Sequence, residues 1–171
     1  MKRLLALSLT LVGGCATLPK HDVPDILELR FDPSKTDRDK VFDAITEALY
    51  ETGYPVVTYD REGGTLETIY KPYNYGCCAK FWAFWGLGVR DPSIRIRVYV
   101  GRAPDDRISV KLQGVLRFKG PRPMSDEYQE RPVKQGTRYW AELEKIAKLM
   151  EEKLGQAGKI TRYEAGLEPW W

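Results

Sequence analysis

The chain has 171 residues, of which 43% are apolar and 30% are charged, with a formal net charge of +3. This length suits one domain with a single hydrophobic core. Two of the surplus charges, Lys2 and Arg3, lie at the N-terminus, so the rest of the chain is nearly neutral. It lacks the basic character typical of nucleic-acid-binding proteins, and we expect no nucleic-acid partner.

The first 15 residues have the layout of an export signal. Two basic residues precede the mostly apolar stretch 4–12, and Gly13 and Gly14 then precede Cys15. A cationic start, a short apolar core and small residues at a cleavage site are the three parts of such a signal. The apolar stretch is too short to cross a bilayer, which takes about 20 residues. A buried strand would explain neither the cations nor the paired glycines.

The stretch Val12-Gly13-Gly14-Cys15 resembles the lipobox of bacterial lipoproteins, in which a branched apolar residue and two small residues precede a cysteine. The resemblance implies that residues 1–14 are removed as a signal peptide. It also implies that Cys15 becomes the first residue and carries two or three acyl chains, such as palmitate. Several chains hold a protein on a membrane where one binds only marginally. Ala16, in place of an aspartate after the cysteine, favours the periplasmic face of the outer membrane over the inner membrane.

Residues 15–24 are polar and contain two prolines, so they are predicted to be a lipidated tether. The alternation over 25–31 predicts a first strand. Residues 37–52 predict a helix, because apolar residues recur every four positions. Either Thr36 or Asp37 has a side chain suited to cap the start of this helix.

Four further strands are predicted in the middle of the chain. Residues 55–60 and 65–70 are rich in β-branched and aromatic residues and flank two glycines, which indicates a hairpin. The alternation over 93–100 predicts a strand with one buried and one basic face. Residues 107–118 predict its neighbour, and Gly114 is expected to allow a bulge.

The basic face of the strand at 93–100 has two interpretations. Arg95 and Arg97, with Lys111 on the next strand, are suited to contact anionic lipid headgroups or an acidic partner. Alternatively, they form an ordinary solvated face that pairs with Glu67 and other nearby acids. We favour the second interpretation.

Residues 119–136 contain three prolines and no clear period, so they are expected to form a connecting loop. Residues 137–154 predict a second helix, which Gly155 ends. The remainder, 158–171, is expected to be a loosely ordered tail. Its final Trp170-Trp171 either frays or docks into a groove.

This order of elements, β-α-β-β-β-β-α, predicts an α+β fold. We expect an antiparallel sheet of about five strands with two helices on one face, formed by residues 25–157. A long C-terminal helix cradled by a curved sheet is a helix-grip arrangement.

The passage from the first helix into the hairpin carries a second resemblance. Gly53-Tyr54-Pro55-Val56-Val57 is followed by Asp60, Gly64, Leu66 and Thr68. This pattern resembles small helix-grip envelope lipoproteins, such as the third lipoprotein of the outer-membrane β-barrel assembly machinery. The resemblance covers residues 37–70 and implies the fold class, but it transfers no functional residue.

The segment 71–91 is the most unusual in the chain, because its aromatic residues are far denser than the overall 12%. They are Tyr73, Tyr75, Phe81, Trp82, Phe84 and Trp85. In one interpretation they form a lid over the core. In the other they are an exposed patch that contacts the membrane interface or a partner, which suits rings with one polar end. The sequence leaves both interpretations open.

Cys77 and Cys78 are the cysteines that remain once Cys15 is lipidated. In the oxidising compartment that the signal implies, they either pair with each other, which closes a strained ring, or are buried as thiols. The single histidine, His21, lies in the tether, so a Cys₂His₂ or Cys₄ zinc site cannot form within one chain.

The same shortage of histidine excludes a Ser-His-Asp or Cys-His catalytic set. We therefore expect no enzymatic activity, no cofactor and no metal. The expected function is binding of a membrane-associated envelope partner. The alternative is a carrier for a lipid or other apolar ligand, held in a cavity between the sheet and the C-terminal helix.

Overall fold

The computed structural model describes residues 25–73, 90–120 and 127–163. Its strands are β1 (Ile26–Phe31), β2 (Val56–Asp60), β3 (Thr65–Thr68), β4 (Lys71–Pro72), β5 (Arg90–Arg102), β6 (Ile108–Lys119), β7 (Tyr128–Pro132) and β8 (Lys159–Tyr163). Its helices are α1 (Arg38–Glu51) and α3 (Trp140–Leu154).

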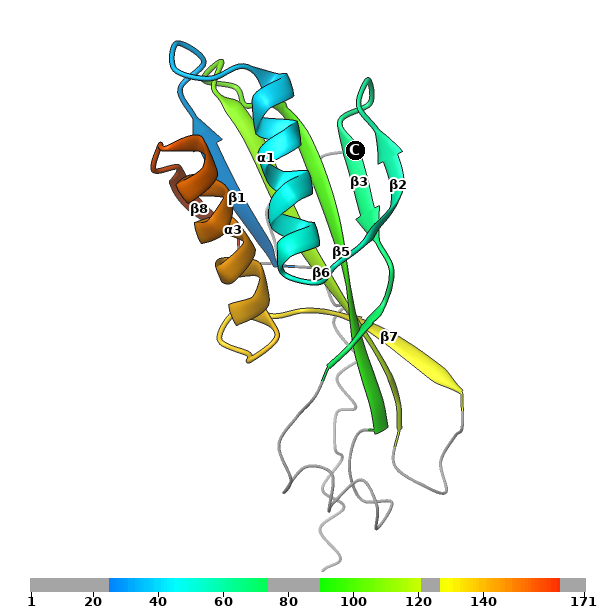
Figure 1. Ribbon diagram of the computed structural model, residues 1–171. Helices are drawn as coiled ribbons and strands as arrows, with labels where there is room; N and C mark the ends of the chain where they lie inside the picture. Colours follow the sequence, from blue (N-terminus) through cyan, green and yellow to red (C-terminus); the bar gives the residue numbers. More distant parts are fainter. Residues whose placement is uncertain (1–24, 74–89, 121–126, 164–171) are drawn as a thin grey trace, which may run out of the picture.

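Within these ranges the eight strands form one antiparallel sheet in the order β2-β3-β5-β6-β1-β8. The short strand β4 also pairs with β5, and β7 pairs with β6 (Figure 1). The sheet and the two helices confirm the α+β class.

Both helices cover the same face of the sheet. Figure 1 shows α1 and α3 side by side in front of β1, β5 and β6, and the two helices contact each other, which a sheet between them would prevent. Alternate residues of the central strands point at the helices and are buried with the apolar stripes of both. Residues of this core include Leu27, Leu29, Phe31, Phe42, Ile45, Leu49, Ile94, Ile96, Val98, Leu112, Leu143, Ile146 and Met150.

The prediction of about five strands was too low. Residues 119–136 were expected to be a loop, but they contain β7, whose side chains are mostly exposed. β7 has no apolar alternation to reveal it, and it exists as a strand because it pairs with the end of β6. In the expected tail, β8 pairs with β1. The sheet therefore extends to residue 163, and the boundary drawn after residue 157 was too early.

The bulge expected at Gly114 is absent. Pairing of β5 with β6 runs without a shift through Ile96↔Gly114, and the irregularity in this pair lies between Arg90 and Ser93. Gly114 is needed for close approach instead, because the backbone N–H of Val133 donates to its carbonyl at 2.8 Å. A Cβ at Gly114 would lie 2.8 Å from Cγ2 of Val133.

The start of α1 is capped by Asp37, which decides between the two predicted caps. Its carboxylate accepts a 2.7 Å hydrogen bond from the backbone N–H of Lys40, the usual role of an N-cap aspartate. This bond lowers the pKa of the Asp37 carboxyl. The helix is thus fixed at its first turn by a residue that the sequence already indicated.

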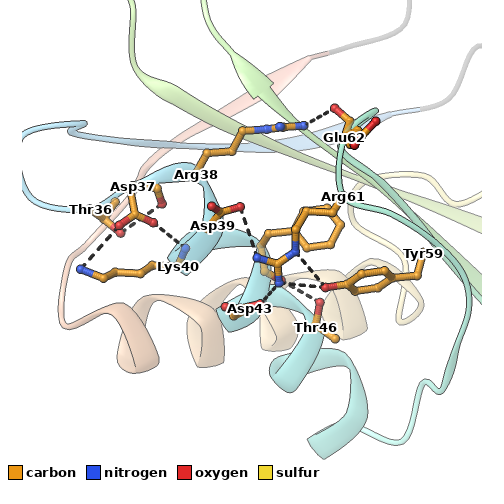
Figure 2. Close-up of polar contacts among 11 residues, drawn as sticks. Thr36, Asp37, Arg38, Asp39, Lys40, Asp43, Thr46, Tyr59, Arg61 and Glu62 are labelled. Atoms are coloured by element: carbon orange, nitrogen blue, oxygen red, sulfur yellow. Dashed lines mark hydrogen bonds and ion pairs between the residues drawn. The ribbon is translucent and has the colours of Figure 1, made fainter.

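Arg61 ties the exposed side of α1 to the hairpin of β2 and β3 (Figure 2). Its guanidinium pairs with Asp39 at 3.2 Å and also with Asp43. It lies 5.3 Å from the ring centroid of Phe42 and donates to the hydroxyl of Tyr59 at 2.9 Å. The hairpin turn is therefore held by charge and by ring contact, on the face that also buries the core.

Candidate functional site

Most of the residues singled out in the sequence lie outside the described part of the chain. They are Cys15, Tyr75, Cys77, Cys78, Phe81, Trp82, Phe84 and Trp85. Their predicted roles in lipidation, disulfide formation and partner contact stay predictions. Tyr73 is the one member of the aromatic set that is described.

Tyr73 follows β4 and packs against the core. Its backbone N–H donates to the carbonyl of Pro92 at 2.8 Å, which fastens it to β5. Its ring meets that of Tyr139 edge-on at 4.8 Å between centroids, next to the first turn of α3. At this one residue the packing agrees with the lid interpretation, because the ring is partly buried against the core.

The face of the sheet opposite the helices carries a cluster of charged and aromatic side chains, which we call the arginine–tyrosine cluster. These residues alternate with buried ones along β3, β5 and β6, Tyr128 and Glu130 stand opposite Lys119 and Arg117 on β7, and Tyr70 joins them from the link before β4. Its members are Glu67, Tyr70, Arg95, Arg97, Arg117, Lys119, Tyr128 and Glu130.

Glu67 neutralises one side of this cluster. It accepts a 2.8 Å hydrogen bond from Nε of Arg97 and pairs with Nη1 of Arg95 at 3.1 Å. The hydrogen bond to Glu67 raises the pKa of Arg97. These contacts confirm the pairing with Glu67 that we favoured for the basic strand face.

On the other side of the cluster, both carboxylate oxygens of Glu130 have partners. One carboxylate oxygen accepts a 2.5 Å hydrogen bond from the hydroxyl of Tyr70. The other oxygen pairs with Nη2 of Arg95 at 3.6 Å. Burial of the phenol, helped by this hydrogen bond, raises the pKa of Tyr70 to about 12. Both oxygens of Glu130 are therefore in use within the cluster.

Arg117 is held differently from its neighbours. Its guanidinium carbon lies 4.1 Å from the ring centroid of Tyr70 and 4.6 Å from that of Tyr128. Glu130 stands opposite it in the β6–β7 register, yet no carboxylate among residues 25–73, 90–120 and 127–158 forms an ion pair with it. Its Nε is buried without a hydrogen-bond acceptor in the same ranges. Arg117 was not predicted as a site residue, although it alternates with Leu116 and Phe118 as Arg95 does with its neighbours.

Beside Glu67 and Arg97 the sheet is hollowed by about 270 Å³. The hollow is lined by Thr58, Thr65, Leu66, Glu67, Arg97, Val98 and Tyr99. Its walls mix polar and apolar groups, and it lies over β2, β3 and β5 at one edge of the sheet. It is thus distinct from the space between sheet and helices, where the sequence suggested a cavity for a carrier.

The described residues offer no metal centre, since they contain no group of three or more His, Cys, Asp and Glu placed to hold an ion. In the same part of the chain, neither helix is long and apolar enough to cross a membrane. No known protein-family model matches the chain, and no similar curated protein is found.

Proposed function

We propose that this chain is a non-enzymatic lipoprotein of the cell envelope, whose periplasmic domain binds a membrane-associated partner. Acyl chains on Cys15 would hold it in the outer membrane. The observation that carries the proposal is the export signal ending in Val12-Gly13-Gly14-Cys15. Its position, charge and small residues all match lipidation at Cys15.

The way the aromatic segment joins the sheet supports a role in contact. Tyr73 and Arg90 are the described residues on either side of residues 74–89. The pairings Lys71↔Ile94 and Pro72↔Ser93 hold these two ends beside each other. Figure 1 shows the start of β5 and the end of β6 projecting beyond the helices, with β7 alongside. A segment rich in Trp and Tyr is suited to a membrane interface or to the centre of a protein interface.

The carrier alternative is less well supported. A carrier needs an apolar cavity, and the described side chains at the centre of the layer between sheet and helices are fully buried. Ile45 and Leu49 of α1, Ile146 of α3 and Val98 of β5 have no exposed surface at all. Densely packed residues of this kind form an ordinary core. The packing therefore favours a binding module that works through its surface.

Fractionation of Cys15→Ser tests the anchor. The wild-type chain should appear in the outer-membrane fraction, and the variant should be uncleaved or released as soluble protein. A variant that is processed and fractionates like the wild type would contradict the proposal. Capture from membranes with the anchor intact, compared with the double variant Trp82→Ser/Trp85→Ser, then tests whether the aromatic segment holds the partner.

A further inference from the structure

The arginine–tyrosine cluster has two carboxylates for its four cations, and with the neighbouring Asp91 counted it keeps one positive charge in excess. Glu67 and Glu130 pair with Arg95 and Arg97. Lys119 pairs with Asp91 at 3.7 Å. The four cations of the cluster therefore meet three carboxylates, and the surplus charge is located on Arg117.

Two tyrosine rings hold the Arg117 guanidinium in place. Contact with an aromatic ring stabilises a cation without neutralising it. It also leaves the N–H groups, which lie in the plane of the guanidinium, available to an oxyanion. Tyr128 is contacted by Lys119 as well, at 4.8 Å from the ring centroid. The Tyr128 ring is therefore shared by two cations, of which Lys119 is paired with Asp91 and Arg117 is not.

We propose that Arg117 binds the phosphate of a phospholipid headgroup, with Tyr70 and Tyr128 as positioning residues. A guanidinium binds phosphate oxygens in a bidentate manner. Arg117 stands opposite Ser93 of β5, which also pairs with Pro72 of β4, so the site lies beside the described residues that flank the aromatic segment. Trp and Tyr, which are frequent in that segment, are enriched at membrane interfaces. The inference rests on the proposed function, because it requires the domain to work next to a membrane.

The test uses the whole lipidated chain in micelles of an uncharged detergent. Dihexanoylphosphatidylglycerol is added, and NMR follows the Nε–H signal of Arg117 and the ring signals of Tyr128. Both should shift saturably, and the affinity should fall as salt is raised, since the attraction is ionic. Arg117→Gln, followed by the Tyr128 ring, should weaken binding at least tenfold.

Two variants separate the site from general charge and from folding. Arg102→Gln removes the same charge at the far end of β5 and should bind like the wild type. Tyr128 is 48% exposed, so Tyr128→Leu should fold normally and weaken binding severalfold. Tyr128→Phe keeps the face of the ring and should bind the lipid as tightly as the wild type. Equal binding by the Leu and Phe variants would overturn the positioning role of Tyr128.

Two other ligands distinguish a phospholipid from a free phosphate and from an acidic protein. Glycerol 3-phosphate has the phosphate without acyl chains and should bind at least tenfold more weakly than the lipid. Equal affinity would overturn the lipid assignment in favour of a free phosphate. A shift caused only by a glutamate-rich peptide would assign the site to an acidic protein, and no shift with any ligand would overturn it altogether. Release of Cys15→Ser from the membrane is measured separately, so either proposal can fail alone.

Discussion

Lys71 closes the C-terminal end of α1, because its Nζ donates a 2.6 Å hydrogen bond to the carbonyl of Thr52. Thr52 is the C-cap residue of that helix. A cation at this end satisfies a free carbonyl and interacts well with the helix dipole. Lys71 also lies 4.4 Å from the ring centroid of Tyr54. The strand that leads into the aromatic segment is thereby joined to the helical layer.

Replacing Lys71 with methionine should therefore destabilise the domain. The change keeps most of the side-chain volume and removes the charged hydrogen bond, so we expect a loss of about 1–2 kcal/mol in the free energy of unfolding. Urea unfolding measures it. Lys40→Met is the matched control, since Lys40 pairs with Asp37 at 3.6 Å while 71% exposed, and such surface pairs contribute little. Equal losses in the two variants would contradict the capping role.

Substitutions at Gly114 and Gly101 test how closely Val133, which follows β7, packs against Gly114 of β6. A Cβ at Gly114 would lie 2.8 Å from Val133, whereas a Cβ at Gly101 would have no neighbour within 4 Å. Overpacking of this kind costs about 1–3 kcal/mol, so Gly114→Ala should lower stability by that amount. Gly101→Ala should change it by less than about 0.5 kcal/mol.

A double variant checks that the cost at Gly114 arises from Val133. Val133 is buried, so Val133→Ala alone should be destabilising. Combined with Gly114→Ala, it should cost clearly less than the sum of the two single changes, because the clash is relieved. Simple additivity would show that Gly114 is needed for another reason.

The order of the main elements was predictable because its signals are local. The four-residue apolar repeat of α1 and the alternation along β5 each lie within one element. β7 and β8 were not predicted because each is a strand through its pairing with another element. β7 pairs with β6, and β8 pairs with β1, which lies near the start of the chain. The polar sequence of β7 has no period of its own.

The candidate site was predictable only in part, for a similar reason. Pairing of Arg95 and Arg97 with Glu67 follows from charge and strand register. The contacts of Arg117 with Tyr70 and Tyr128 could not be foreseen, because both tyrosines lie outside the strands predicted to neighbour it. Once β7 is absent from a prediction, nothing places Tyr128 beside β6.

Burial of Tyr54 should make the free energy of unfolding depend on pH in the alkaline range. Its side chain is 1% exposed and its hydroxyl donates to Glu142 at 3.2 Å. Burial, followed by the charge of Glu142, raises the pKa of Tyr54 above the ordinary value of 10.0. The unfolded chain therefore releases this proton first, so the contribution to stability is complete below pH 10 and is lost as pH rises beyond it.

Unfolding in urea between pH 9 and pH 11 should show this loss. Tyr54→Phe should decline less steeply than the wild type above pH 10, and at neutral pH it should lose about 0.5–1.5 kcal/mol for the missing hydrogen bond. Tyr50→Phe is the control, because that side chain is 56% exposed, and its profile should follow the wild type. Identical slopes for wild type and Tyr54→Phe would assign the alkaline loss to other groups.

Trp82→Ser with Trp85→Ser decides between the two interpretations of the aromatic segment. If the two indoles form an exposed contact surface, thermal unfolding should change by no more than about 2 °C, since exposed substitutions cost little. Capture of the membrane partner should then be lost. If they are a lid on the core, the change should approach the about 3–5 kcal/mol typical of a buried tryptophan. Trp140→Phe, within α3 and 3% exposed, supplies the reference for a buried site, and a fall in melting temperature as large as its own would favour the lid.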